Sequence, residues 1–200
     1  MNFRLSHNRY EEIKNIIVEL FIKYNVKSIP IIGFELASKM GIKVIPYSYF
    51  SEKKQKLLFD MSENGFLAET TDNEFYIYYN DTQNAGRVNN TILHEIGHIV
   101  LNHTEESELA EAEVNFFAKY ALVPPVLVYK LKINSPYRIA ELFDVSIQAS
   151  FYAFNYYQKW LKYGSKNYTD YEIKLIGLFK CVLNAKGGGF MDVKKTSIKL

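Results

Sequence analysis

The stretch that decides the fold is residues 85–101, which read AGRVNNTILHEIGHIVL. Apolar residues recur in its second half at helical spacing, so the segment predicts a long helix with a buried face. The apolar positions are Ile92, Leu93, Ile96, Ile99 and Val100. Polar side chains are costly to bury without partners. The two histidines and the glutamate between them, at positions 94, 95 and 98, therefore need a partner inside the fold.

A metal ion is the partner that this spacing favours. His94 and His98 stand four residues apart, which places both imidazoles on one face of a helix. Zinc takes nitrogen ligands at about 2.0–2.1 Å, so the pair supplies half of a four-coordinate shell. Glu95 follows His94 directly and can reach a metal-held water as a general base. His-Glu-x-x-His also arises by chance, but the apolar setting favours a zinc peptidase site. Manganese or iron would also accept these ligand types.

The third ligand is expected from the next predicted helix, residues 107–122. Glu113 lies in the middle of its apolar stripe, where a lone carboxylate must be paired or bound to metal. An antiparallel turn between the two helices would bring Glu113 level with His98. Glu111 is the second choice. The alternative for Glu113 is an ion pair with Arg87 or with a lysine.

His103 is close to the motif but has the wrong spacing for a third ligand. The metzincin pattern places a glycine and a histidine at positions where this chain has Leu101 and Thr104. His103 is instead expected at the helix end, as a carbonyl cap or as a contact to substrate or transition state.

Composition narrows the functional classes. The formal net charge is +2 over 200 residues, which argues against nucleic-acid binding driven by bulk charge. Residues 135–163 could form a helix-turn-helix, but their second helix has no basic residue before Lys159, so direct nucleic-acid binding is not expected. The single cysteine fits a reducing compartment, and no apolar stretch is long enough for a membrane span. A cytoplasmic protein is predicted; the oligomeric state is left open.

The order of predicted elements indicates an α+β fold with a small central sheet flanked by helices. Residues 42–46 read as one strand, and residues 66–69 and 74–79 as a hairpin. Residues 1–163 are expected to form the main domain with its N-terminal helices, followed by a helical extension at 164–186. A flexible tail is expected at 187–200 because of its glycine run.

Two segments resemble the ImmA/IrrE family of metallopeptidases. Residues 94–103 read HEIGHIVLNH, and residues 111–124 read EAEVNFFAKYALVP. The second contains the family's Glu-Ala-Asn-x-Phe-Ala pattern at 113–118, with Val114 in place of the usual alanine. The resemblance covers about residues 31–163. It departs from the family in the helix after Ser146, where an arginine is common and none stands here.

The resemblance implies a zincin-like fold and a gluzincin-like site. Zinc would be held by His94, His98 and Glu113, with Glu95 as the catalytic base. It also implies a regulatory endopeptidase that cleaves a helix-turn-helix repressor of a phage or mobile element. The alternative is a metal-stabilised binding module, or a toxin or immunity component, that acts by docking a partner without proteolysis.

Overall fold

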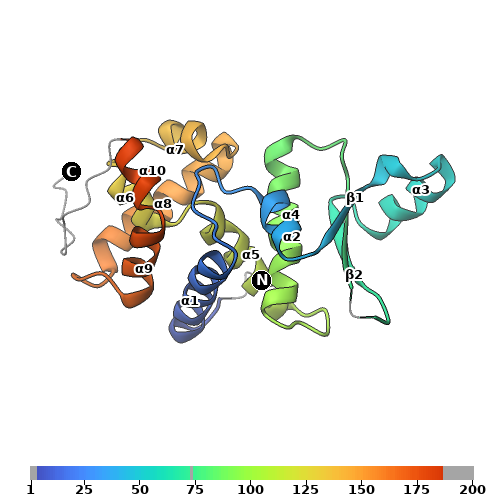
Figure 1. The fold of residues 1–200 in the computed structure, drawn as a ribbon, viewed down its shortest axis with the longest axis horizontal. Helices are drawn as coiled ribbons and strands as arrows, with labels where there is room; N and C mark the ends of the chain where they lie inside the picture. Colours follow the sequence, from blue (N-terminus) through green and yellow to red (C-terminus); the bar gives the residue numbers. More distant parts are fainter. Residues whose placement is uncertain (1–3, 73, 187–200) are drawn as a thin grey trace. The chain divides into compact units, whose positions relative to one another are not determined.

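A computed structural model of the protein describes residues 4–72 and 74–186 (Figure 1). The chain forms two compact units. Of the described residues, the first unit comprises 4–13, 32–72 and 74–118, and the second comprises 14–31 and 119–186. The first unit carries the sheet and the His-Glu-x-x-His helix, whereas the elements of the second unit are helices. The domain boundaries predicted at residues 163 and 186 stay predictions, and the predicted tail, 187–200, lies outside the described residues.

The first unit is built on a three-stranded mixed sheet with the order β1-β3-β2. Its strands are β1 (Lys43–Pro46), β2 (Gly65–Glu69) and β3 (Phe75–Tyr79). β1 pairs parallel to β3, and β2 pairs antiparallel to it with Leu67 opposite the fully buried Ile77. The predicted hairpin and the predicted first strand are therefore confirmed. In the part of the chain that the structure describes, β2 is an edge strand, and no other strand pairs with its outer side.

Helix α4 (Ala85–Val100) is the long helix expected from residues 85–101, and it lies beside the sheet (Figure 1). Its N-cap Asn84 accepts a hydrogen bond from the Arg87 amide, as a capping asparagine should. Ile92, Leu93 and Ile96 are fully buried, which confirms the apolar face read from the sequence. The short helices α2 (Gly33–Lys39) and α3 (Glu52–Met61), with the 3-10 turn η1 (Tyr47–Tyr49), complete this part of the unit.

Helix α5 (Glu108–Leu122) follows α4 after a short corner and is preceded by Ser107, whose hydroxyl accepts from the Ala110 amide at 3.0 Å. The two helices approach closely at Gly97. A Cβ placed there would stand 3.1 Å from a ring carbon of Phe117 and 3.2 Å from a methyl of Val114. This contact brings the end of α4, with both motif histidines, against the first turns of α5.

The second unit contains most of α1 and the helices that follow α5. Their bounds are α1 (His7–Lys23), α6 (Pro125–Lys130), α7 (Pro136–Phe143), α8 (Ile147–Tyr163), α9 (Asp170–Leu178) and α10 (Lys180–Ala185). Within the predicted helical extension, 164–186, the structure has two helices, α9 and α10, which are separated at Phe179. Inside this unit the Trp160 indole donates to the buried Glu172 at 2.5 Å, and Thr169 forms a capping box with the same glutamate.

The prediction of an α+β fold with a helical C-terminal part is confirmed. None of the helices in the described part of the chain combines the length and the apolar character needed to cross a membrane.

Candidate metal centre

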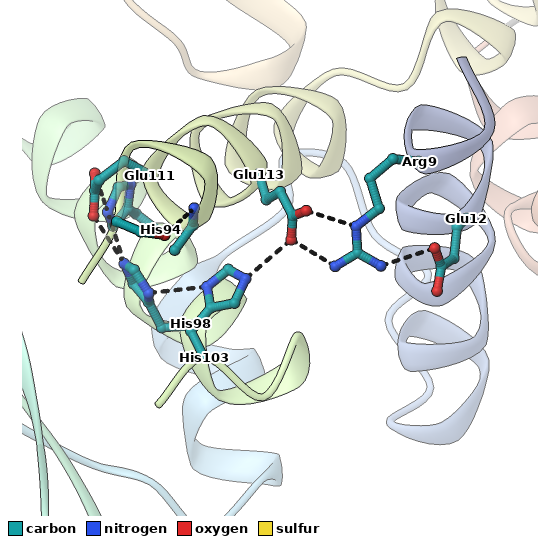
Figure 2. Close-up of polar contacts among 9 residues, drawn as sticks. Arg9, Glu12, His94, His98, His103, Glu111 and Glu113 are labelled. Atoms are coloured by element: carbon teal, nitrogen blue, oxygen red, sulfur yellow. Dashed lines mark hydrogen bonds and ion pairs between the residues drawn. The ribbon is translucent and has the colours of Figure 1, made fainter. Parts of the chain in front are cut away.

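Three side chains from α4 and α5 bring their ligand atoms together. The Nε2 atoms of His94 and His98 are 3.3 Å apart. Glu111 faces both, with one oxygen 3.3 Å from His98 Nε2 and the other 3.6 Å from His94 Nε2 (Figure 2). Among residues 4–72 and 74–186, this is the group of histidine, cysteine and carboxylate side chains compact enough to hold a metal ion.

The size of this triangle fits zinc. A tetrahedral ion with bonds of about 2.0–2.1 Å has ligand atoms separated by about 3.3–3.4 Å. The two ring nitrogens, 3.3 Å apart, match that separation, and each oxygen of Glu111 lies at a similar distance, 3.3 or 3.6 Å, from one of them. Two imidazoles and one carboxylate also match the ligand set of catalytic zinc, in which a fourth position stays open for water or substrate.

The electrostatics of the two imidazoles favour metal binding. Burial lowers the pKa of both His94 and His98, although the negative charge of Glu111 opposes this effect. A lowered pKa keeps the rings neutral near pH 7, and a neutral imidazole is the form that binds a metal. The site is therefore set up to receive a cation without first losing two protons.

Glu95 lies in the same turn of α4 but points elsewhere than its histidine neighbours. It is only 7% exposed. Burial raises its pKa to about 8, the nearby charge of Glu111 adds to this, and a hydrogen bond from the backbone amide of Leu67 opposes it. That amide belongs to β2, so the carboxylate stands between the histidine helix and the edge strand of the sheet. This is the position expected of a base that works on a substrate held near the strand.

Glu113, the predicted third ligand, is not part of the triangle. The Arg9 guanidinium donates from Nε to one of its oxygens at 2.7 Å and from Nη2 to the other at 2.5 Å. These hydrogen bonds hold the pKa of Glu113 below its usual value, with a further contribution from His103. The structure brings the second choice, Glu111, to the histidines, while Glu113 faces the opposite direction (Figure 2). The cause is a competing partner that satisfies the buried carboxylate.

Part of the reasoning about Glu113 holds. Its side chain is buried, at 6% exposed, as its place in the apolar stripe predicts, and it does have a charged partner. The partner is Arg9 rather than Arg87, whose Nε donates instead to Asn64. Arg9 was missed because it lies 104 residues away in sequence. A signal was available: Arg9 is four residues before the buried Ile13, on the face of α1 that turns inward.

His103 lies between the metal-site histidines and Glu113. Its Nδ1 is 3.2 Å from Nδ1 of His98, and its Nε2 is 3.0 Å from Glu113 Oε2. The backbone amide of His103 also donates to the His98 carbonyl at 3.0 Å, so His103 lies at the end of the helix. A contact between His103 and substrate stays a prediction.

Comparison with known families agrees with this geometry. The model of the IrrE N-terminal-like domain, peptidase family M78, matches residues 37–154, which is more than half of the chain. The match confirms the resemblance to the ImmA/IrrE family and, with it, the zincin-like class of the fold. No curated protein matches the chain. The matched segment contains the three residues of the triangle and Glu95, but it begins after Arg9.

Proposed function

Because the chain belongs to peptidase family M78 through its IrrE N-terminal-like domain, we propose that it is a zinc-dependent endopeptidase that cleaves a specific regulatory protein. The observation that carries the proposal is the triangle of His94, His98 and Glu111 beside the buried carboxylate of Glu95. We assign the first three to zinc and the fourth to proton transfer.

The chemistry divides between the metal and the chain. Bound zinc would supply a Lewis acid for the scissile carbonyl and would lower the pKa of a water molecule. Glu95 takes a proton from the attacking water and returns it to the leaving amine. Its hydrogen bond from the Leu67 amide fixes the direction of the carboxylate, so the proton is moved at a defined place.

The edge strand β2 supports a peptide as the substrate. The Thr70 amide donates to the Glu74 carbonyl and the Asn80 amide to the Asn64 carbonyl. The backbone N–H and C=O groups of the even-numbered residues of β2 therefore point toward β3. The backbone groups of Leu67 and Glu69 consequently face outward, and the Leu67 amide points to Glu95. We expect an extended peptide to pair with this edge and to pass the catalytic glutamate.

A proline at position 69 tests whether the substrate peptide pairs with the outer edge of β2. Proline is tolerated on an edge strand when its missing amide faces outward. Glu69→Pro should therefore keep the fold but slow cleavage at least about tenfold, the effect of losing roughly one hydrogen bond of about 1.4 kcal/mol. Glu69→Ala, which keeps the amide, is the control and should cleave normally. Equal rates for both variants would place the peptide elsewhere.

The proposed substrate is a helix-turn-helix repressor of a phage or mobile element, met in the cytoplasm. This part rests on the family alone. Docking of the repressor without cleavage, as in the alternative function, would need the metal only for structure. Both accounts expect bound zinc, but only the peptidase requires the Glu95 carboxylate.

Co-expression with a candidate helix-turn-helix repressor, followed by mass measurement, tests the proposal. Wild type should yield two fragments whose masses sum to the repressor plus one water. Glu95→Gln should keep one zinc per chain and yield none, whereas Glu108→Gln, a change at an exposed position on α5, should cleave like wild type. Release of the repressed genes by Glu95→Gln, with the repressor intact, would refute proteolysis and support the docking account.

A further inference from the structure

A chain of polar contacts leads from the N-terminal helix to the candidate metal site. It runs from Arg9 to Glu113, from Glu113 to His103, and from His103 to His98, with separations of 2.5, 3.0 and 3.2 Å (Figure 2). We propose that Arg9, Glu113 and His103 are positioning residues that hold His98 in the orientation and proton tautomer required for zinc. The proposal rests on the metal site described under the proposed function.

The direction of the hydrogen bonds follows from the role of His98. Its Nε2 faces Glu111 and His94, so this atom must offer a lone pair to a metal. A neutral imidazole carries one N–H, which must then be on Nδ1. That N–H points at Nδ1 of His103, 3.2 Å away, which must accept it. Zinc-binding histidines commonly donate their second N–H to a fixed acceptor in this way.

Glu113 makes this direction the favourable one. When His103 accepts at Nδ1, its own proton is on Nε2 and is donated to Glu113 at 3.0 Å. In the reverse tautomer, two lone pairs would face each other across that distance, and His98 would carry its proton on the atom needed for zinc. Arg9 in turn occupies both oxygens of Glu113 and fixes the plane of the carboxylate.

The contacts that link Arg9, Glu113 and His103 are largely shielded from water. The His103 and Glu113 side chains are 12% and 6% exposed, and Arg9 is 27% exposed. Hydrogen bonds shielded from water are stronger, and a partner lost from such a chain is not readily replaced by solvent. Arg9 lies outside residues 37–154, so the segment that matches the family model does not contain the first member of this chain.

The backbone places His103 for this task. Helix α4 ends in a Schellman motif, in which the His103 amide donates to the His98 carbonyl and the Asn102 amide to the Ile99 carbonyl. Asn102 adopts the left-handed conformation, φ 54°, that this ending requires. The turn folds His103 back over His98, so the contact between the two rings is built into the end of the helix.

Zinc affinity, measured by competition with a chelator on the purified full chain, tests the proposal without any substrate. His103→Leu and Arg9→Gln should each weaken zinc binding by about 10–100-fold, the effect usual for partners of metal ligands. His103→Gln keeps an acceptor for His98 and should restore most of the affinity. Glu12→Gln is the matched control for Arg9, because Glu12 contacts the same guanidinium through Nη1 but is not one of the residues that link Arg9 to His98. The zinc affinity of Glu12→Gln should equal that of wild type.

Cobalt substitution gives a second readout. The visible spectrum of the cobalt protein should shift in His103→Leu, because the His98 ligand is reoriented, and should remain unchanged in Glu12→Gln. Zinc affinities of His103→Leu and Arg9→Gln within twofold of wild type, with unchanged cobalt spectra, would overturn the positioning role and leave the proposed function intact. A wild-type chain that binds no zinc would overturn both.

Discussion

The two sides of helix α5 place carboxylates in opposite surroundings. The Glu111 side chain is 49% exposed and faces two imidazoles, whereas Glu113, two residues further on, is 6% exposed and is held by an arginine. A carboxylate that stays charged when buried needs permanent charged or hydrogen-bonding partners, because its charge is costly whenever they leave. An exposed carboxylate is solvated while it waits for a metal. Burial therefore identifies the residue that must be paired within the fold, and it does not identify the residue that binds a dissociable ion.

The strongest test of this comparison removes each carboxylate in turn. Glu111→Ala should weaken zinc binding on the order of 10³-fold, because one of three protein ligands carries about a third of a binding free energy of roughly 10–16 kcal/mol. Glu113→Ala should weaken it only about 10–100-fold, as an outer partner does. Isothermal titration of the metal-free variants with zinc, in the presence of a competing chelator, measures both.

The two losses of zinc affinity could also fall in the opposite order. A larger loss from Glu113→Ala than from Glu111→Ala would make Glu113 the ligand, as the apolar stripe of α5 first indicated. The hydrogen bonds from Arg9 would then have to break when zinc enters. Equal losses near tenfold would mean that neither carboxylate binds the metal directly.

Changes on the buried side of α5, where Arg9 contacts Glu113, should lower the free energy of unfolding. Arg9→Met leaves Glu113 without its main partner and should lower the free energy of unfolding of the metal-free protein by about 2 kcal/mol. The double variant Arg9→Met, Glu113→Gln should recover part of this loss, because the uncompensated charge is gone. Arg138→Met removes an exposed pair with Glu141, whose side chains are 50% and 66% exposed, and should cost less than about 1 kcal/mol. Urea unfolding measures all three; equal losses in the two single variants would show that Glu113 does not need Arg9.

Sequence reasoning succeeded where the controlling contacts are local. The His-Glu-x-x-His helix and the hairpin of β2 and β3 each depend on residues close to one another in sequence. Helical spacing alone brings His94 and His98 together, so this half of the candidate site could be read directly.

The third ligand position depends on contacts that are remote in sequence. Glu111 and Glu113 both lie within reach of α4, and the choice between them is made by Arg9, which belongs to a helix 104 residues away. Periodicity shows that Glu113 turns inward, but it does not show which helix packs against it. The outward N–H of Leu67 was likewise hidden, because it follows from strand order and register rather than from any side chain.

The close approach of α4 and α5 at Gly97 brings Glu111 and Glu113 within reach of the histidines. Gly97→Ala would push against Phe117 and Val114, a crowding cost of about 1–3 kcal/mol that outweighs the roughly 1 kcal/mol gain in helix propensity. We expect a net loss of about 1 kcal/mol in unfolding free energy and weaker zinc binding. Gly177→Ala, at a position in α9 where no atom lies within 4 Å of the new Cβ, should instead stabilise by about 0.5 kcal/mol. Stabilisation by both changes would show that the helices can separate without cost.

The smallest expected effect concerns the turn that places His103. A similar turn at the end of helix α1 serves as the control. Helix α1 ends as α4 does: Asn25 has φ 51°, and the amide that follows it, Val26, donates to the Phe21 carbonyl at 2.8 Å. Alanine in the left-handed conformation costs about 1 kcal/mol relative to asparagine, so Asn102→Ala and Asn25→Ala should lower the unfolding free energy by similar amounts.

Zinc binding should separate the two asparagine variants. Asn102→Ala loosens the turn that carries His103 and should weaken zinc binding by about threefold, a fraction of the 10–100-fold that loss of a metal-ligand partner costs. Asn25→Ala loosens a turn that bears none of the metal-site chain, so its zinc affinity should match wild type. If both variants lost zinc affinity in proportion to their stability, the effect would be a general one, and the turn at Asn102 would have no particular part in orienting His98. If only Asn102→Ala lost zinc affinity, the backbone turn at Asn102 would help to orient His98, in addition to the side-chain contact that Glu113 makes with His103.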